Sequence, residues 1–360
     1  MPVLLAALTL SAPSTCAAQR ATVGELRQLL AQQQAAHLSD DQVASQLGSL
    51  ELTERLTDVT LDQIKDEFNP GAQTAARLNV LADLSAFLQP PAGEVPGKAP
   101  LTAAEQQEML RAVENFATVT LKNLPDFLAQ RTTKSFEDVP ILTEDLNAQS
   151  GMHPVGSSAR EVAYRNGLEF ASDAAAAAKQ ASQSAPLPAL SSSGEFGPVL
   201  ATIMRDSAAG KITWSHWEQT STGPAAVFRF DVPGDSAHYM IDFCCSRNPV
   251  TRTMESYHGT PGYHGSITVN PSTGAVIRLT LESDLETLNP TQHFGLLVRY
   301  GNVEIGGRNL ICPLGSAVLI RSVILARKHS WNVIHLNEVS FTNYRRFGST
   351  AQIVPDAPSR

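Results

Sequence analysis

The feature that most constrains the fold of this chain is a run of short alternating segments from Tyr263 to Ile320. Asn270 to Gly274 and Ile305 to Gly307 supply residues that suit the tight turns of β-hairpins. The flanking residues alternate between apolar and polar, as strands with one buried face do. This pattern predicts a meander of antiparallel strands that forms a curved sheet with one apolar face.

The same two-residue period extends over much of the second half of the chain. An earlier pair of strands is expected at 134–140 and 161–170, and the second carries an Asn166-Gly167 hairpin signal. The sheet is therefore expected to begin near residue 131. The further candidate strands are 211–219, 225–232, 237–245, 264–270, 274–283, 295–305, 308–322 and 331–348.

The first part of the chain, up to about residue 130, has a helical pattern. Apolar residues recur at spacings of three and four, which is typical of helices with one buried stripe. Three capping boxes are expected to begin helices, and four or five helices are expected to pack as an array. The boxes are Ser39 with Gln42, Thr60 with Gln63, and Thr102 with Glu105.

These patterns predict an α+β protein in which an all-helical N-terminal array precedes a curved antiparallel half-barrel. A short amphipathic helix at 196–209, with Pro198 near its first turn, is expected to cover the sheet. The helical domain is predicted at 19–130 and the half-barrel domain at 131–355. The Ala-rich and Ser-rich stretch at 171–194 is expected to be a mobile surface loop.

The first 18 residues resemble a secretory signal peptide. An apolar stretch from Val3 to Leu10 precedes the small residues at Cys16-Ala-Ala18. The sequence therefore predicts a periplasmic or secreted protein that begins near Gln19 after cleavage, and leaves envelope association open. No Lys or Arg precedes Arg20, so a cytoplasmic location is the alternative, and lipidation at Cys16 is a less favoured alternative to cleavage.

Overall composition excludes some classes of function. The net charge is −8, with 42% hydrophobic and 17% charged residues, which is ordinary for a packed protein of 360 residues with two domains. No basic run could neutralise a phosphate backbone, so no nucleic-acid partner is expected. No transmembrane segment is expected in the mature chain.

Three cysteines would follow the signal: Cys244, Cys245 and Cys312. Neighbouring residues of a strand point to opposite faces, so only one of the adjacent pair can face Cys312. Cys245 shares the parity of the inward-facing Ile241 and Phe243, which predicts a Cys245–Cys312 disulfide. The alternative is three unpaired thiols in a reducing compartment.

Two motifs carry side chains that could do chemistry. His258 and His264 lie in His-Gly pairs around a Pro-Gly turn, but a stable metal site needs at least three ligands, so no metal and no cofactor are expected. Trp214, His216 and Glu218 should share one face of a strand. Ser215 would then point away from His216, which would prevent activation of the serine. The Trp rings are expected to line the core or the rim of a cavity, with each N–H bonded to a polar group.

The chain resembles the periplasmic lipoprotein-carrier and lipoprotein-receptor family over residues 131–350. The resemblance lies in Phe136-Glu-Asp-Val-Pro140, the Trp214-Ser-His-Trp217 strand, the hairpins from Tyr263 to Pro313, and the closing Leu336–Tyr344 strand. It extends to exported bacterial proteins with a helical N-terminal half and a carrier-like C-terminal half. It implies a half-barrel sheet that holds a hydrophobic ligand.

The function that we expect from this sequence is non-enzymatic binding, with an enzyme as the less favoured possibility because no catalytic motif is present. A lipid, a lipoprotein acyl chain or another hydrophobic ligand would lie on the concave apolar face. The alternative is an interaction, stress-sensing or scaffold module with a filled core, whose partner is an envelope protein. The expected ligand-binding residues are Phe228, Phe230, Tyr239, Ile241, Phe243, Ile203 and Met204.

Overall fold

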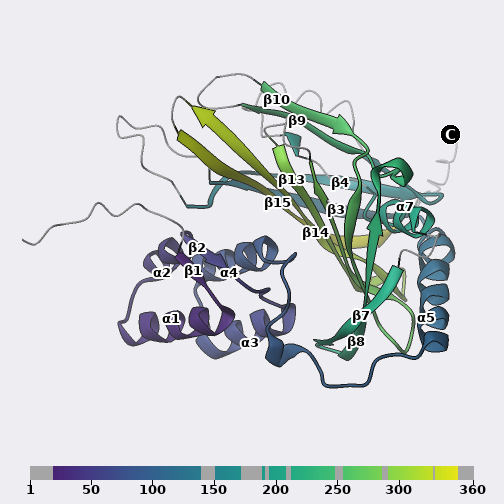
Figure 1. Ribbon diagram of the computed structural model, residues 1–360, viewed down its shortest axis with the longest axis horizontal. Coiled ribbons are helices and arrows are strands. Elements are labelled where there is room, and N and C mark those ends of the chain that lie inside the picture. Colours follow the sequence, from purple (N-terminus) through teal and green to yellow (C-terminus); the bar gives the residue numbers. More distant parts are fainter. Residues whose placement is uncertain are drawn as a thin grey trace, which may run out of the picture.

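The computed structural model confirms the α+β class, with helices and a large antiparallel sheet (Figure 1). The predicted signal segment and most of the predicted loop at 171–194 lie outside the residues that the structure describes. The described residues are 19–138, 151–171, 189–190, 194–207, 212–247, 254–285, 291–326 and 329–347.

Residues 19–89 form a helical unit at one end of the molecule (Figure 1). Its core consists of apolar residues at helical spacing, including the fully buried Leu26, Ile64 and Leu78. A parallel pair of short strands, which the sequence did not predict, ties its first residues to the loop after the second helix. Its elements are β1 (Gln19–Ala21), α1 (Val23–Ala35), α2 (Asp40–Leu47), β2 (Leu50–Leu52), α3 (Asp58–Phe68) and α4 (Ala72–Leu84).

Side-chain caps define where several of the helices begin. The capping boxes predicted at Ser39 and Thr102 begin α2 and α5 (Ala103–Asn115), respectively. The prediction at Thr60 is wrong by one turn, because Thr57 is the N-cap residue of α3. The backbone N–H of Thr60 donates to the Thr57 hydroxyl at 3.3 Å, so Thr60 lies inside the helix.

Ten strands form one open antiparallel sheet in the order β5-β4-β3-β15-β14-β13-β12-β11-β8-β7. The edge strands do not pair with each other, so the barrel is not closed. The Asn166-Gly167 hairpin is confirmed, with φ of 51° and 79°. The strands are β3 (Phe127–Glu137), β4 (His153–Arg165), β5 (Leu168–Ala171), β7 (Ile212–Thr220), β8 (Gly223–Val232), β11 (Tyr263–Val269), β12 (Val276–Asp284), β13 (Thr291–Ile305), β14 (Arg308–Ala326) and β15 (His329–Arg346).

A second, three-stranded sheet contains β6 (Ala189–Leu190), β9 (Ile241–Arg247) and β10 (Met254–Gly259). The strand predicted at 237–245 therefore does not belong to the main meander. Ile241 and Phe243 of β9 nevertheless join the same buried cluster as the large sheet. The small sheet thus packs against the large one and adds to its core.

One face of the large sheet, called the apolar face below, is covered by three helical segments. These are α5, the π-helix η2 (Phe116–Thr120) and α7 (Pro198–Asp206). α5 was predicted to belong to the helical domain, but Val113 at its C-terminal end packs with the sheet, so that domain does not extend to residue 130 as a packed unit. The apolar face carries Phe228, Phe230, Ile267, Leu279, Leu281, Leu296, Val298, Val318 and Ile320.

The opposite face, called the polar face below, carries the helical unit. Val80 of α4 and Ala86, just after that helix, pack in a cluster with Leu297, Leu319 and Leu336 of the sheet. The helical unit and the sheet therefore share a small apolar interface.

Two further contacts fix this interface. The Phe87 ring lies directly over Gly295, where an added Cβ atom would come within 2.6 Å of the ring, so a larger residue there would require the ring to move. Arg299 of β13 donates to Asp83 at 2.8 Å and to Asp58 at 3.2 Å, and thereby bridges the sheet to α4 and α3. Burial alone would lower the pKa of Arg299, but the carboxylates of Asp83 and Asp58 outweigh this effect and raise it.

Candidate functional site

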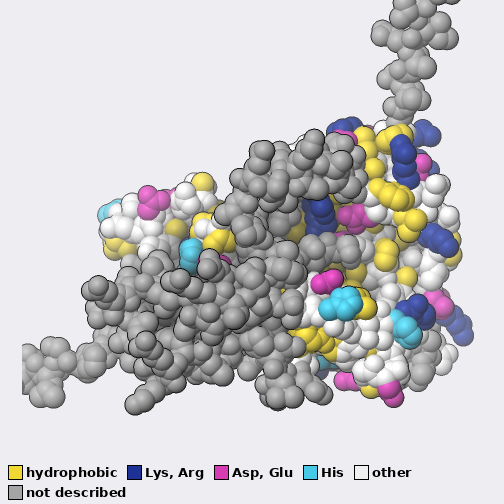
Figure 2. Space-filling view, turned by 90° about the horizontal axis from the view of Figure 1, so that it is seen from above, with side chains coloured by type: hydrophobic (Ala, Val, Ile, Leu, Met, Phe, Trp, Pro, Cys, Tyr) yellow, Lys and Arg dark blue, Asp and Glu magenta, His cyan; other side chains and the backbone are white. Residues whose placement is uncertain are grey.

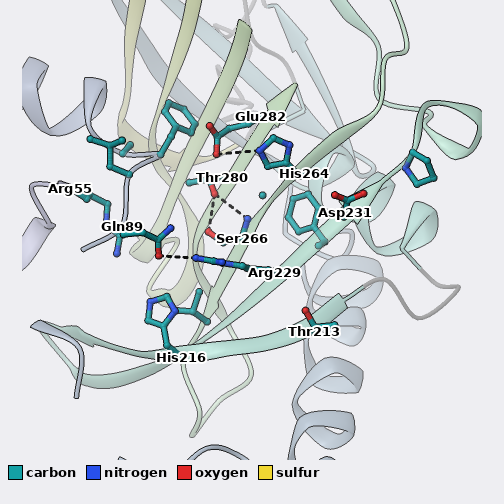
Figure 3. Close-up of a pocket in the computed structure, with 17 residues that line it drawn as sticks. Arg55, Gln89, Thr213, His216, Arg229, Asp231, His264, Ser266, Thr280 and Glu282 are labelled. Atoms are coloured by element: carbon teal, nitrogen blue, oxygen red, sulfur yellow. Dashed lines mark hydrogen bonds and ion pairs between the residues drawn. The ribbon is translucent and has the colours of Figure 1, made fainter. Parts of the chain in front are cut away.

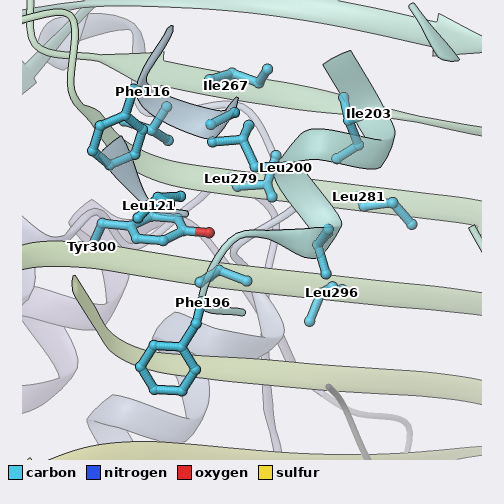
Figure 4. Close-up of a cluster of buried hydrophobic side chains, with 14 of the residues drawn as sticks. Phe116, Leu121, Phe196, Leu200, Ile203, Ile267, Leu279, Leu281, Leu296 and Tyr300 are labelled. Atoms are coloured by element: carbon cyan, nitrogen blue, oxygen red, sulfur yellow. The ribbon is translucent and has the colours of Figure 1, made fainter. Parts of the chain in front are cut away.

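The seven residues predicted to bind a hydrophobic ligand are brought together, but they lie in a packed core. Phe228, Phe243 and Ile203 are fully buried, and Phe230 and Ile241 are 2% exposed. Tyr239 and Met204 are partly buried against the same cluster. In Figure 4, Leu200 and Ile203 of α7 point at the sheet residues Leu279, Leu281 and Leu296. The helix therefore fills the space that a ligand was expected to occupy.

A buried carboxylate holds the C-terminal end of α7 in place. Asp206 accepts hydrogen bonds from the hydroxyl of Tyr263 at 2.7 Å and from the backbone N–H of His238 at 2.9 Å, and the His238 ring lies 2.8 Å away. Burial alone would raise the pKa of Asp206, but these bonds outweigh it and lower the pKa below its ordinary value. Asp206 thus ties α7 to β11 and to the segment before β9.

The segment before α7 has its own buried anchor. Glu195 is completely buried, and its carboxylate accepts a hydrogen bond from Ser316 at 3.0 Å and lies 3.6 Å from Arg131. Its carbonyl oxygen also accepts a bond from the Tyr300 hydroxyl at 2.9 Å. Polar contacts at both ends therefore hold α7 on the apolar face.

The structure does not support the predicted Cys245–Cys312 disulfide. Cys312 is a free, fully buried cysteine on β14 of the large sheet, whereas Cys245 belongs to β9 of the small sheet. Burial raises the pKa of the Cys312 thiol to about 12, so the thiol is protonated and unreactive at neutral pH. The inference failed because equal parity along a strand does not place two strands in the same sheet.

The expected arrangement of Trp214 to Glu218 is wrong because β7 contains a bulge between Trp214 and His216. The bulge places Ser215 Oγ 2.9 Å from His216 Nδ1, although the two side chains were expected to point apart. It also brings Trp217 beside Trp214 on the core side, with ring centroids 5.1 Å apart.

Trp217 is buried, and its indole N–H donates to the carbonyl of Ala99 at 2.7 Å. This contact confirms the expectation that the ring lines the core with its N–H bonded to a polar group. The Lys98 ammonium lies 3.7 Å from the centre of the same ring. Trp217 therefore fastens the connector before α5 to β7.

The two histidines of the His-Gly pairs face different carboxylates on different sheets. His258 of β10 lies 3.4 Å from Asp242, and His264 of β11 lies 4.0 Å from Glu282. His264 is 47% exposed at its side chain, as expected. No group of three or more His, Cys, Asp or Glu side chains suitable for a metal ion occurs in the part of the chain that the structure describes.

The polar face has a cavity of about 790 Å³ where the sheet meets the helical unit (Figure 3). Strand alternation places polar side chains from β8, β11 and β12 on the same face, while their neighbours enter the core. We call this the interface cavity. Its polar lining residues are Arg55, Gln89, Thr213, His216, Arg229, Asp231, His264, Ser266, Thr280 and Glu282, and Phe87 and Leu88 also line it.

Positive charge dominates one end of the interface cavity. Arg55, from the loop before α3, lies 2.5 Å from the Glu218 carboxylate, and Arg278 of β12 lies 2.9 Å from the same oxygen. Burial lowers the pKa of Arg55 to about 10, with a further contribution from Arg278, and Glu218 opposes both effects. Arg55 is therefore still protonated at neutral pH, and two guanidinium groups share one carboxylate.

Two other groups complete this end of the cavity. Arg229 of β8 donates to the side chain of Gln89 at 2.7 Å (Figure 3). His216 of β7 lies 3.9 Å from Glu218, and burial lowers the pKa of its imidazole below the ordinary value. His216 is therefore mostly neutral at pH 7, and the local positive charge comes from the arginines.

The interface cavity was not predicted from the sequence, because only the apolar positions of each alternating strand were used as candidate site residues. The signal that could have found it is a set of arginines at the intervening positions: Arg229 of β8, Arg278 of β12 and Arg299 of β13 all lie on the polar face. Arginines at such positions are expected on a solvated face. Only the docking of the helical unit turns part of that face into a cavity.

A second cavity of about 790 Å³ lies between the helical unit and the sheet at β3 and β4. Arg77 and Lys134 are its basic lining residues, and Asp41 is its acidic one.

On the face seen in Figure 2, acidic and basic side chains of the described residues are interspersed and form no single-sign surface.

Comparisons of the chain with protein-family models, with curated proteins and with solved structures found no match. In the described part of the chain, no helix combines the length and the apolar character that are needed to cross a membrane.

Proposed function

We propose that the protein is a non-enzymatic binding module with a filled core, which acts through contacts with an envelope protein partner. The observation that carries this proposal is the closed apolar face. Five of the seven residues expected to contact a hydrophobic ligand are at most 2% exposed, and α7 lies among them. A preformed pocket for a hydrophobic ligand has accessible apolar surface. The side chains expected to form such a pocket here have almost no accessible surface.

The buried polar contacts at the two ends of α7 support the same proposal. A carrier would need the helix to move away from the sheet to admit an acyl chain. That movement would leave the carboxylates of Glu195 and Asp206 without their present partners, which is costly for buried charges.

The alternative proposal is a carrier that holds a lipid or a lipoprotein acyl chain on the concave side of a half-barrel. It is supported by the resemblance to the lipoprotein carriers and by the open, curved sheet. In that case α7 is the segment that moves, and Phe228, Phe230 and Ile203 are the residues that the ligand uncovers. Export to the periplasm belongs to both proposals, and its test is whether the N-terminus of protein from the native host begins near Gln19.

Mass spectrometry of organic extracts distinguishes the two proposals. Protein purified without detergent from an envelope fraction is extracted, and lipid is measured per mole of chain. We expect well below one lipid per chain and no saturable binding of a fluorescent fatty acid. Near-stoichiometric lipid, lost in a folded Phe230→Asp variant, would establish the carrier and refute the filled-core module.

A further inference from the structure

The interface cavity has the size and position of a ligand site. Its volume of about 790 Å³ lies in the usual range for small-molecule pockets, roughly 300–1,000 Å³. Its walls come from two separate parts of the chain, with Arg55 and Gln89 on the helical unit and Arg229 and Ser266 on the sheet (Figure 3). Phe87, from the segment after α4, also lines the cavity and packs over Gly295 of the sheet.

The basic end of the cavity has unused capacity to bind an anion. Arg55 lines the cavity and is 5% exposed, and its Nε–H, which is itself shielded from solvent, finds no acceptor among the described residues. Its only ion-pair partner there, Glu218, is shared with Arg278. Arg229 is the second arginine that lines the cavity, and among the described residues its side chain donates only to the neutral amide of Gln89. An oxyanion placed here would gain a charge-assisted hydrogen bond from the exposed Arg229 and would lie near the positive charge of Arg55.

The other end of the cavity carries two carboxylates, Asp231 and Glu282, with His264 on the strand between them and 4.0 Å from Glu282. Asp231 follows Arg229 by two residues on β8, so both side chains lie on the same face of the strand, roughly 7 Å apart along it. Glu282 lies on β12 beside the Ser266 and Thr280 hydroxyls, whose oxygens are 2.8 Å apart. Carboxylates at this end would repel a second anionic group on the ligand and attract an amine.

We propose that the interface cavity binds a small molecule that carries one carboxylate or phosphate group at Arg55 and Arg229 and an amine at Asp231. The site is formed by charged residues of the polar face and goes beyond the proposed function, although Phe230 of the apolar core also borders the cavity. The shared chemistry is an oxyanion joined to an amine over a short span, as in a short peptide or a phosphoamine.

Isothermal titration calorimetry with three probes tests the proposal: acetate, glycylglycine and phosphoethanolamine. Glycylglycine or phosphoethanolamine should bind at least tenfold more tightly than acetate, and the tighter of the two identifies the oxyanion. The tighter probe at ten times its Kd should raise Tm by about 2 °C. Failure of both zwitterions to bind at 50 mM, or equal affinity for acetate, would overturn the proposal.

Three substitutions locate the site on the protein. Arg229→Gln should weaken the tighter probe at least tenfold, and Asp231→Asn should remove its preference over acetate. Both residues are exposed, so the variants should fold, and their unliganded Tm checks this. Arg308→Gln, at an exposed arginine that begins β14, is the matched control and should bind as the unmodified protein does. Equal effects of Arg229→Gln and Arg308→Gln would refute the assignment.

Discussion

The two faces of the large sheet are built from the same strands but are closed in different ways. The apolar face is covered by α5, η2 and α7, whose side chains fill it without leaving the predicted ligand residues accessible. The polar face is covered by the helical unit through a small apolar cluster and the charged bridge of Arg299, and a cavity is left beside them. The surplus of large apolar residues on one face of the sheet therefore indicated the protein core. The accessible cavity lies on the polar face.

The strongest test of this difference is a cavity-creating substitution on the apolar face. Phe228 is fully buried between Trp214 and the rest of the core, so Phe228→Ala should lower the free energy of unfolding by about 4 kcal/mol. Phe170→Ala is the matched control, because Phe170 is 48% exposed and its loss should change stability by less than about 0.5 kcal/mol. Urea denaturation measures both. Equal effects would mean that the apolar face is not the core.

On the polar face, the bridge between the sheet and the helical unit should come next in size. Arg299→Met removes the partner of Asp83, which is 3% exposed, so an unpaired carboxylate would be buried. We expect a loss of about 3 kcal/mol, because breaking a buried ion pair leaves its desolvation cost uncompensated.

An exposed ion pair supplies the control for the bridge. Arg345 pairs with Glu161 on the surface, so Arg345→Met should cost less than about 1 kcal/mol. Thermal unfolding would compare the two variants. A loss for Arg299→Met no larger than for Arg345→Met would show that the polar interface does not depend on this bridge.

The elements that the sequence predicts well are those that depend on local signals. Strands β7, β8, β11 and β12 lie within two residues of their predicted bounds, because alternation and turn residues are properties of short segments. The capping boxes at Ser39 and Thr102 were found for the same reason. Local patterns therefore give most of the secondary structure.

What the sequence could not supply is the partner of each segment. The apolar stripe of α5 shows that the helix is buried, but not that it packs on the sheet rather than on α1 to α4. No turn residue marks the bulge at Ser215 in the sequence. The bulge places the Ser215 and His216 side chains in contact, although they were expected to point to opposite faces. The interface cavity depends on how two distant parts of the chain dock, so no local pattern contains it.

The attachment of α7 gives a third prediction, which tests how firmly the apolar face is closed. Asp206→Asn keeps the shape of the side chain but replaces charge-assisted bonds from Tyr263 and His238 with weaker ones. We expect a loss of about 2 kcal/mol. Hydrogen exchange of the α7 amides should accelerate with it.

The control for this prediction is Asp235→Asn, at an exposed carboxylate that accepts a hydrogen bond from the neighbouring Ser236. It should leave α7 exchange unchanged. If hydrogen exchange of the α7 amides is unchanged in Asp206→Asn as well, the contacts of Glu195 are sufficient to hold the helix on the sheet.

The smallest effect that we predict concerns pH and the buried His335 of β15. Burial lowers the pKa of His335 to about 4, from an ordinary value of 6.5, so folding favours the neutral imidazole. The unfolded chain binds the proton more readily, and stability is therefore lost as pH falls from about 6.5 towards 4. Between pH 8 and pH 5.5 the loss should be about 1 kcal/mol.

A variant comparison isolates this effect from other groups. Burial raises the pKa of Asp138 to about 6, so protonation of Asp138 stabilises the fold as pH falls. In the unmodified protein this effect opposes the destabilisation that comes from His335. The measurement is therefore the difference in Tm between pH 8 and pH 5.5 in the unmodified protein and in His335→Gln, which should lose less stability on acidification. His258→Gln, at an imidazole that is 70% exposed, should keep the original pH dependence. If His335→Gln is as acid-sensitive as the unmodified protein, His335 does not account for the loss of stability on acidification.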